Sequence, residues 1–162
     1  MSDIHWFVAH TKPRREKKLV DFCQRQNLAV SLPCYSSAHK YRGKTVVFQK
    51  PLFPGYVFLQ LSEAQRDPVR QNDHLANLLE VFDQQLFERQ LNSILAAIEA
   101  RVDVQLAPSI GPGMRVRIKY GPLRGIEGWV ETRSGMTTVL LRLDFISQAA
   151  AVKLEADWLE LA

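Results

Sequence analysis

Cysteine is scarce in this chain of 162 residues, and long apolar runs are missing from it. The two cysteines, Cys23 and Cys34, form no CxxC pair and no disulfide framework, so we expect two small core residues. No apolar stretch is long enough to span a bilayer, and the N-terminus lacks the charged-then-apolar pattern of a signal peptide. These absences predict a cytoplasmic globular protein without a membrane partner.

The usual signatures of catalysis are also missing. The four histidines are dispersed and show no metal-ligand spacing with cysteines or carboxylates. There is no G-x-S-x-G and no Walker A motif, and the segment GPLRGIEG (121–128) lacks the Gly-Lys-Ser/Thr ending of a phosphate loop. We therefore expect a binding protein with no catalytic residue, no metal and no cofactor. An enzyme would need an acid/base pair that only the fold brings together.

Positive charge is concentrated in the first third of the chain. Residues 1–60 carry ten Lys/Arg against three Asp/Glu, whereas residues 61–162 carry eleven against fourteen. A localised basic surface suits an anionic partner, of which nucleic acid is the leading candidate. A solvated, solubilising surface would give the same charge pattern, and charge alone does not separate the two.

The first hundred residues predict a mixed α/β module. Residues 4–9 alternate as a strand, and 29–35 reads as a second strand. Between them we expect a basic helix with Thr11 or Lys12 as its cap and Pro13 in its first turn. Residues 38–50 predict a hairpin with its turn near Arg42-Gly43-Lys44. The stretch PLFPGYVFLQL (51–61) predicts a strand whose start is set by its prolines and Gly55.

The rest of the chain predicts a second, all-β module. Residues 62–74 are polar and predicted irregular, 77–82 a short strand, and Asp83 the cap of a helix that reaches about Arg101. Residues 103–112 read as a linker because they hold two prolines and a glycine. The last fifty residues hold four or five short strand patterns with turn signals between them, which predicts a small barrel.

Three motifs in this order resemble the NusG/RfaH family of transcription elongation factors. They are a W-F-V strand before a basic helix, a hairpin that leads into LFPGYVF, and the C-terminal stretch VRIKYGPLRGIEGWV, which is similar to a KOW motif. The resemblance covers nearly the whole chain. It implies an α+β fold: a four-stranded antiparallel sheet flanked by helices, then a five-stranded SH3-like (KOW) barrel. The expected domains are a NusG N-terminal-like domain at 1–102, a linker at 103–112 and a KOW domain at 113–162.

The resemblance also implies a function. The N-terminal domain would bind bacterial RNA polymerase near the DNA of the transcription bubble and suppress pausing or termination. The KOW domain would recruit a partner, such as a small-subunit ribosomal protein or Rho, and we expect a monomer. The alternative is an RNA- or ribosome-associated KOW protein that binds nucleic acid directly; such a protein would not need an exposed apolar surface at 53–58.

Family motifs carry specific roles onto residues of this chain. The resemblance implies that the polymerase clamp helices contact Val8, His10, Phe53, Tyr56 and Phe58. Phe53 and Phe58 could instead be core residues, whereas the Tyr56 hydroxyl favours contact with water or a partner. The implied nucleic-acid-facing residues are Lys12, Arg14, Arg15, Lys17, Lys18, Arg42 and Lys44. Each of these cations could also be a solvated surface charge.

The implied partner-binding residues of the KOW domain are Phe145 and Ile146, although one of them could simply close the barrel. General family members continue this pair with Gly-Arg, where this chain has Ser147-Gln148, which puts Rho binding in doubt. Residues 62–83 also depart from the glycine-rich, apolar pattern of general members. These departures suggest a specialised NusG paralogue, by analogy alone. The Val- and Thr-rich segment 137–161 favours a stable barrel over a helical second state.

Overall fold

The computed structural model describes residues 3–107, 113–133 and 136–162, and side chains are described for these except 132–133 and 136. They form three helices and antiparallel sheets, so the expected mixed α/β class is confirmed. The chain divides into two compact units, 1–33 with 53–86 and 34–52 with 87–162. Across the described residues no helix is both long and apolar enough to cross a membrane.

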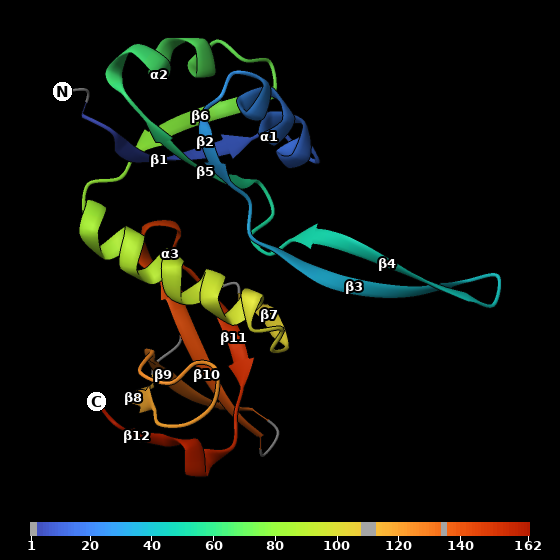
Figure 1. Cartoon of the computed structure of the whole chain (residues 1–162), viewed down its shortest axis with the longest axis vertical. Helices are drawn as coiled ribbons and strands as arrows, with labels where there is room; N and C mark the ends of the chain where they lie inside the picture. The colour runs from blue at the N-terminus through green and yellow to red at the C-terminus, as the bar shows by residue number, and fades with distance from the viewer. Residues whose placement is uncertain (1–2, 108–112, 134–135) are drawn as a thin grey trace. The chain divides into compact units, whose positions relative to one another are not determined.

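The first unit is built on a four-stranded antiparallel sheet in the order β2-β5-β1-β6 (Figure 1). Its strands are β1 (His5–Thr11), β2 (Ala29–Ser31), β5 (Tyr56–Leu61) and β6 (Leu75–Glu80). Alternate residues such as Phe7, Ala9 and Leu59 form a core with Leu19 and Cys23 of helix α1 (Glu16–Arg25). These strand residues share one face because every second side chain of a strand points to the same side, and side chains of α1 and of residue Val69 cover that face.

Helix α2 (Glu63–Arg70) lies where the sequence predicts irregular chain, so that prediction is wrong. The Gln65 side-chain oxygen accepts the Ser62 backbone N–H at 2.9 Å, which supplies one of the partners that a helix start lacks. Val69 anchors the helix in the core. The expected start of α1 is also wrong: the helix begins at Glu16, after a turn in which Arg14 has φ +62°.

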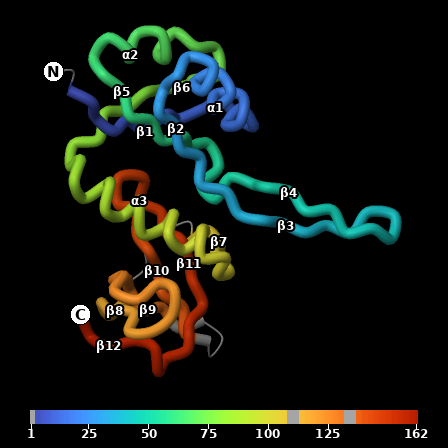
Figure 2. Tube along the Cα trace, viewed as in Figure 1, coloured from blue at the N-terminus to red at the C-terminus, as the bar shows by residue number. Residues whose placement is uncertain are grey.

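A separate two-stranded ribbon joins β3 (Cys34–Tyr41) to β4 (Lys44–Pro51) and pairs with neither larger sheet (Figure 2). Tyr41 pairs with Lys44, so the turn is Arg42-Gly43, and both residues have positive φ (49° and 78°). Two consecutive positive φ values are typical of the two-residue turns that fit the twist of a hairpin. The predicted hairpin and its turn are confirmed.

The C-terminal sheet has six strands, in the order β12-β8-β9-β10-β11-β7. Five of them lie after residue 112: β8 (Met114–Ile118), β9 (Glu127–Arg133), β10 (Met136–Leu143), β11 (Gln148–Lys153) and β12 (Leu159–Leu161). The sixth, β7 (Val104–Ala107), lies inside the range expected to be linker and pairs with β11. Ala107 is buried with Leu140 and Ala149, which explains why this short segment is a strand. Residues 108–112 of the expected linker lie outside the described residues.

Helix α3 (Gln84–Glu99) begins in the first unit and continues in the second. Asp83 accepts the Leu86 N–H at 3.1 Å, so the predicted helix cap is confirmed. Gln84 fixes the start of the helix to β1: its side chain accepts the Trp6 N–H and donates to the Trp6 carbonyl at 3.0 Å.

Candidate functional site: a tyrosine turn and two basic surfaces

The segment Phe53-Pro54-Gly55-Tyr56 is a tight turn at the entrance to β5. The Tyr56 N–H donates to the Phe53 carbonyl at 3.1 Å, with Pro54 and Gly55 at the two central positions. Gly55 has φ +88°, which the second central position of a type II turn requires and which favours glycine. The Pro-Gly pair therefore makes a sharp turn that fixes where Tyr56 begins the strand.

This turn is also fixed to its surroundings by two backbone contacts. The Gly55 carbonyl accepts the Thr11 N–H at 2.9 Å, which ties the turn to the end of β1. The Gly55 N–H donates at 3.2 Å to a carboxylate oxygen of Glu16, a residue only 8% exposed. A buried carboxylate needs such donors, so the first residue of α1 and the turn hold each other in place.

The turn brings Tyr56 beside His10. The two residues are cross-strand neighbours on β1 and β5, and their rings are stacked with centroids 5.2 Å apart and planes inclined by 23°. His10 is exposed and Tyr56 is half-buried. Of the five residues expected to contact the clamp, these two are accessible.

The other three expected clamp residues, Val8, Phe53 and Phe58, are buried to within 1% of full burial. Val8 lies opposite Phe58 across β1 and β5, and the Phe53 ring meets the Phe58 ring edge-on at 6.3 Å. The structure thus places all five residues on β1, on β5 and in the 53–56 turn that leads into β5. The aromatic pair Phe53–Phe58 links this turn to β5. Phe53 and Phe58 are therefore core residues in this structure, which is the alternative that the sequence left open for them.

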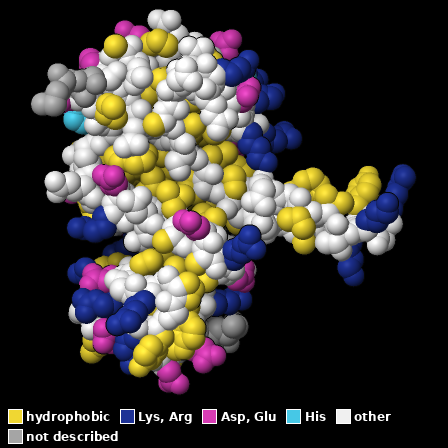
Figure 3. Space-filling model, in the orientation of Figure 1, with side chains coloured by type: hydrophobic (Ala, Val, Ile, Leu, Met, Phe, Trp, Pro, Cys, Tyr) yellow, Lys and Arg dark blue, Asp and Glu magenta, His cyan; other side chains and the backbone are white. Residues whose placement is uncertain are grey.

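The basic residues expected to face nucleic acid fall into two groups. Lys12, Arg14, Lys17 and Lys18 are exposed at the start of α1, while Arg15 is half-buried with its guanidinium 3.5 Å from the His74 ring nitrogen. Arg42 and Lys44 are exposed at the tip of the ribbon, where dark-blue side chains gather in Figure 3. Between Asp21 and Glu63 the sequence contains no acidic residue, so nothing in this stretch offsets the ribbon's charge.

The apolar side chains of the ribbon are exposed as well. Tyr41 is 69% exposed and Phe48 is 50% exposed, and Val46 and Val47 are also open to solvent. Phe48 lies beside His39, with ring centroids 5.7 Å apart. Sequence reasoning missed these residues as functional candidates, although a hairpin rich in both cations and exposed aromatics is typical of a nucleic-acid-binding surface.

The two residues expected to bind a partner, Phe145 and Ile146, lie in a short 3-10 turn (Asp144–Ile146) between β10 and β11. Ile146 is buried, and the half-buried Phe145 ring meets Phe87 of α3 edge-on at 6.3 Å. The side chain of Gln90 binds Asp144 twice, accepting its N–H at 2.9 Å and donating to its carboxylate at 3.0 Å. Within this unit, α3 therefore occupies the face of the turn that carries Phe145.

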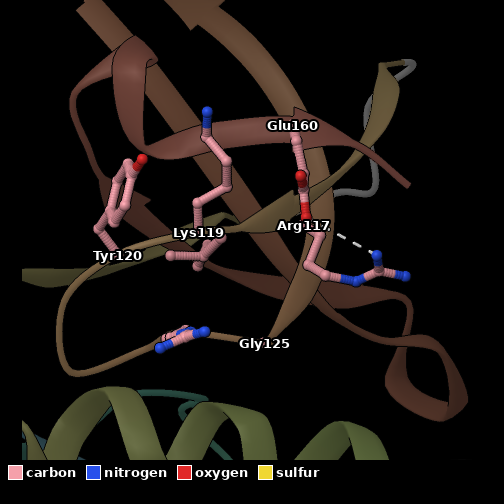
Figure 4. A pocket seen from close by; sticks show the side chains of 7 residues that line it. Arg117, Lys119, Tyr120, Gly125 and Glu160 are labelled. Atoms are coloured by element: carbon pink, nitrogen blue, oxygen red, sulfur yellow. Dashed lines mark ion pairs between the residues drawn. The ribbon is translucent and has the colours of Figure 1, made fainter.

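A second glycine turn follows β8 and was missed as a site by sequence reasoning. Its cleft, of about 370 Å³, is lined by Arg117, Lys119, Tyr120, Arg124 and Glu160, together with Ile118 and Gly125 (Figure 4). Arg115 and Arg117 both bind Glu127, Arg117 at 2.8 Å, which holds the pKa of that carboxyl below its usual range. In the described segments no cluster of histidine, cysteine and carboxylate side chains is suited to a metal ion.

Comparison with known proteins agrees with the motifs. The family model described as "Transcription termination factor nusG" matches residues 4–94, which is more than half of the chain. The transcription termination/antitermination protein NusG of Lactococcus lactis subsp. lactis (strain IL1403) is 25% identical, covering 98% of this chain and 93% of its own length. The solved MjSpt4:Spt5 complex (conformation B) is 14% identical and covers 97% of this chain and 96% of its own, but its TM-score of 0.32 supports no conclusion. This chain belongs to the NusG family of transcription factors.

Proposed function

We propose that this protein is a transcription elongation and antitermination factor, not an enzyme, that binds bacterial RNA polymerase through its N-terminal domain. The observation that carries the proposal is the stacked His10–Tyr56 pair, held accessible by the turn at Gly55. Tyrosine combines a large apolar ring with a polar hydroxyl and is enriched at the centres of protein interfaces. Val8, Phe53 and Phe58 lie on the same strands and turn and support this pair as buried neighbours.

The first test is the affinity of the full chain for purified bacterial core RNA polymerase. Tyr56→Ala removes the ring and hydroxyl of a half-buried residue, so we expect a loss of about 2 kcal/mol of binding free energy, or about thirtyfold in Kd. Tyr120→Ala removes the same side chain from the other unit and is the matched control. Unchanged affinity of the Tyr56→Ala protein, with its unfolding curve intact, would contradict the proposed contact.

We propose that the cations at the start of α1 and at the ribbon tip face DNA near the transcription bubble. The residues are Lys12, Arg14, Lys17, Lys18, Arg42 and Lys44, which are exposed, and the half-buried Arg15. Phosphate contacts require only positive charge. The ribbon supplies it in a stretch without acidic residues (22–62), and at the start of α1 the acid Glu16 is bound to Gly55.

The variant that tests this contact is the double reversal Lys12→Glu/Lys18→Glu, because both side chains are exposed. Arg14 and Arg15 are less suitable, since one has a positive φ and the other contacts His74. Recruitment to a polymerase elongation complex should fall by about tenfold at low salt and by much less at high salt. A loss that does not depend on salt would point to misfolding.

The C-terminal part has a proposed role of its own. We propose that 1–102 is the polymerase-binding domain and that 113–162 is an SH3-like KOW domain joined to it through 103–112. Through Phe145 and Ile146 it would recruit a protein partner, such as a small-subunit ribosomal protein or Rho. Recruitment would require α3 to release Phe145, because Phe87 and Gln90 now contact this turn. A Gln90→Ala variant should bind such a partner more tightly than wild type in a pull-down; equal capture would contradict this role.

The departures at Ser147-Gln148 and at 62–83 support a specialised paralogue that acts as a cytoplasmic monomer with the polymerase. Transcription in vitro across a terminator, with and without the full chain, separates antitermination from enhanced termination. Read-through should rise in the presence of the protein. Increased termination would contradict the proposed direction and leave polymerase binding untouched.

A further inference from the structure

The loop between β8 and β9 is rigidly built. Gly121 and Gly125 have φ values of 86° and 90°, and Leu123 between them is buried. The Gly125 N–H donates to the Ile118 carbonyl at 2.8 Å, and the Lys119 N–H donates to the Trp158 carbonyl at 2.6 Å. A loop fixed at both its ends and its centre loses little freedom on binding, so its side chains are preorganised.

The cleft beside this loop is basic. Of the described residues that line it, Arg117, Lys119 and Arg124 are cations, and Glu160 is the one acid. Arg117 is held by Glu127 at 2.8 Å and by Glu160 at 3.8 Å. Lys119 and Arg124 form no ion pair within the part of the chain that the structure describes, so their charge is available to an anion.

An exposed aromatic ring lies next to these cations. Tyr120 is 56% exposed, and the Lys119 ammonium lies 5.4 Å from the centre of its ring. Figure 4 shows the Lys119 and Tyr120 side chains extending side by side just after β8, with the Arg117–Glu160 ion pair on the other side of Lys119. A ring this open presents a flat face, on which a planar group can stack.

We propose that this cleft binds a single-stranded nucleic acid, with phosphates at Lys119 and Arg124 and a base stacked on Tyr120. Cations that follow a phosphate backbone, combined with an aromatic platform for bases, are how proteins bind single strands without sequence preference. An acidic peptide would use the cations but not the flat ring. The inference does not depend on polymerase binding, because all its residues lie in the second unit.

The experiment is a nuclear magnetic resonance titration of the isotopically labelled full chain with oligouridine or oligothymidylate of about eight nucleotides. The amide signals of residues 119–126 should shift with at least one oligonucleotide, and which one identifies RNA or DNA as the source. Because each amide is observed separately, binding at the basic start of α1 is distinguished from binding at this loop. If neither oligonucleotide shifts the loop, the proposal is overturned.

Variants then assign the roles within the cleft. Lys119→Ala/Arg124→Ala should abolish the loop shifts, whereas Arg89→Ala/Lys153→Ala, an equal charge loss at exposed residues of the same unit, should leave them. Tyr120→Leu should weaken binding at the loop by about tenfold and Tyr120→Phe should not, because stacking requires the ring alone. The proposal would be overturned if the Arg89→Ala/Lys153→Ala double variant weakened oligonucleotide binding as much as Lys119→Ala/Arg124→Ala does. Loop shifts of equal size with a polyglutamate peptide would also overturn it.

Discussion

Two glycine turns in this chain present a tyrosine in similar ways and yet differ in their surroundings. At 53–56, Gly55 places Tyr56 against the ring of His10, with an acid, Glu16, bound to the turn. At 119–126, two glycines shape a loop whose Tyr120 lies beside Lys119 near Arg117 and Arg124. A glycine turn can thus present a tyrosine on two different kinds of surface. The charges of the neighbouring residues then determine whether the surface suits a protein partner or a phosphate backbone.

The largest expected effect on the Tyr120 loop comes from substitution of Gly121. A Cβ there would lie 2.5 Å from the Trp158 ring, and the φ of 86° adds backbone strain. We expect Gly121→Ala to lower the free energy of unfolding by about 3 kcal/mol, combining strain and overpacking. Urea unfolding followed by tryptophan fluorescence measures this loss.

Gly125 is the matched control in the same loop. Its φ is 90°, but a Cβ would meet nothing within 4 Å. Gly125→Ala should therefore cost about 1 kcal/mol, from backbone strain alone. Equal losses for the two substitutions would mean that contact with Trp158 does not set the shape of the loop.

The smallest expected effect is the pH dependence of stability that Glu127 contributes through its ion pairs with Arg115 and Arg117. Arg117 and Arg115 lower the pKa of Glu127 from its ordinary value of 4.5. Because the folded pKa is lower than the unfolded one, this stabilisation is present above pH 4.5 and is lost as the pH falls through the folded pKa. The Glu127 carboxylate is exposed enough for solvent to screen it, so the loss should be small.

Glu127→Gln tests this linkage. The unfolding midpoint of the variant should fall less than that of wild type between pH 5 and about pH 3, when both are measured by urea unfolding. Asp21→Asn, which removes an exposed i,i+4 pair with Arg25, is the control in the other unit. Parallel pH profiles for wild type and Glu127→Gln would show that the Arg–Glu cluster does not contribute.

Local signals in the sequence predicted much of the fold. The Arg42-Gly43 turn, the Asp83 cap and strands such as β1 and β5 follow from turn chemistry and apolar alternation, which act over a few residues. Helix α2 was missed because its sequence is polar and contains Pro68, although the Ser62–Gln65 capping pattern is a local signal of a helix start. Strand β7 was missed because only its pairing with β11, more than forty residues away, makes it a strand.

The candidate sites were predictable to different degrees. The FPGY turn can be read from the sequence, since Pro-Gly is a turn signal wherever it lies. Which of its neighbours are accessible could not be read, because burial of Val8, Phe53 and Phe58 depends on packing. The cleft at Tyr120 was missed although its cations and the glycines of GPLRGIEG lie close together in the sequence. Sequence alone does not show that this loop folds into a cleft with Glu160 as one of its lining residues.

The most direct test measures both surfaces in one crossed experiment with the full chain. Wild type, Tyr56→Ala and Tyr120→Ala are each titrated against bacterial core RNA polymerase and, separately, against a labelled single-stranded oligonucleotide. The polymerase affinity should fall about thirtyfold for Tyr56→Ala and stay unchanged for Tyr120→Ala, with the oligonucleotide affinity responding in the opposite way. Polymerase binding that is the same for all three folded proteins would contradict the central claim that the Tyr56 turn contacts the polymerase.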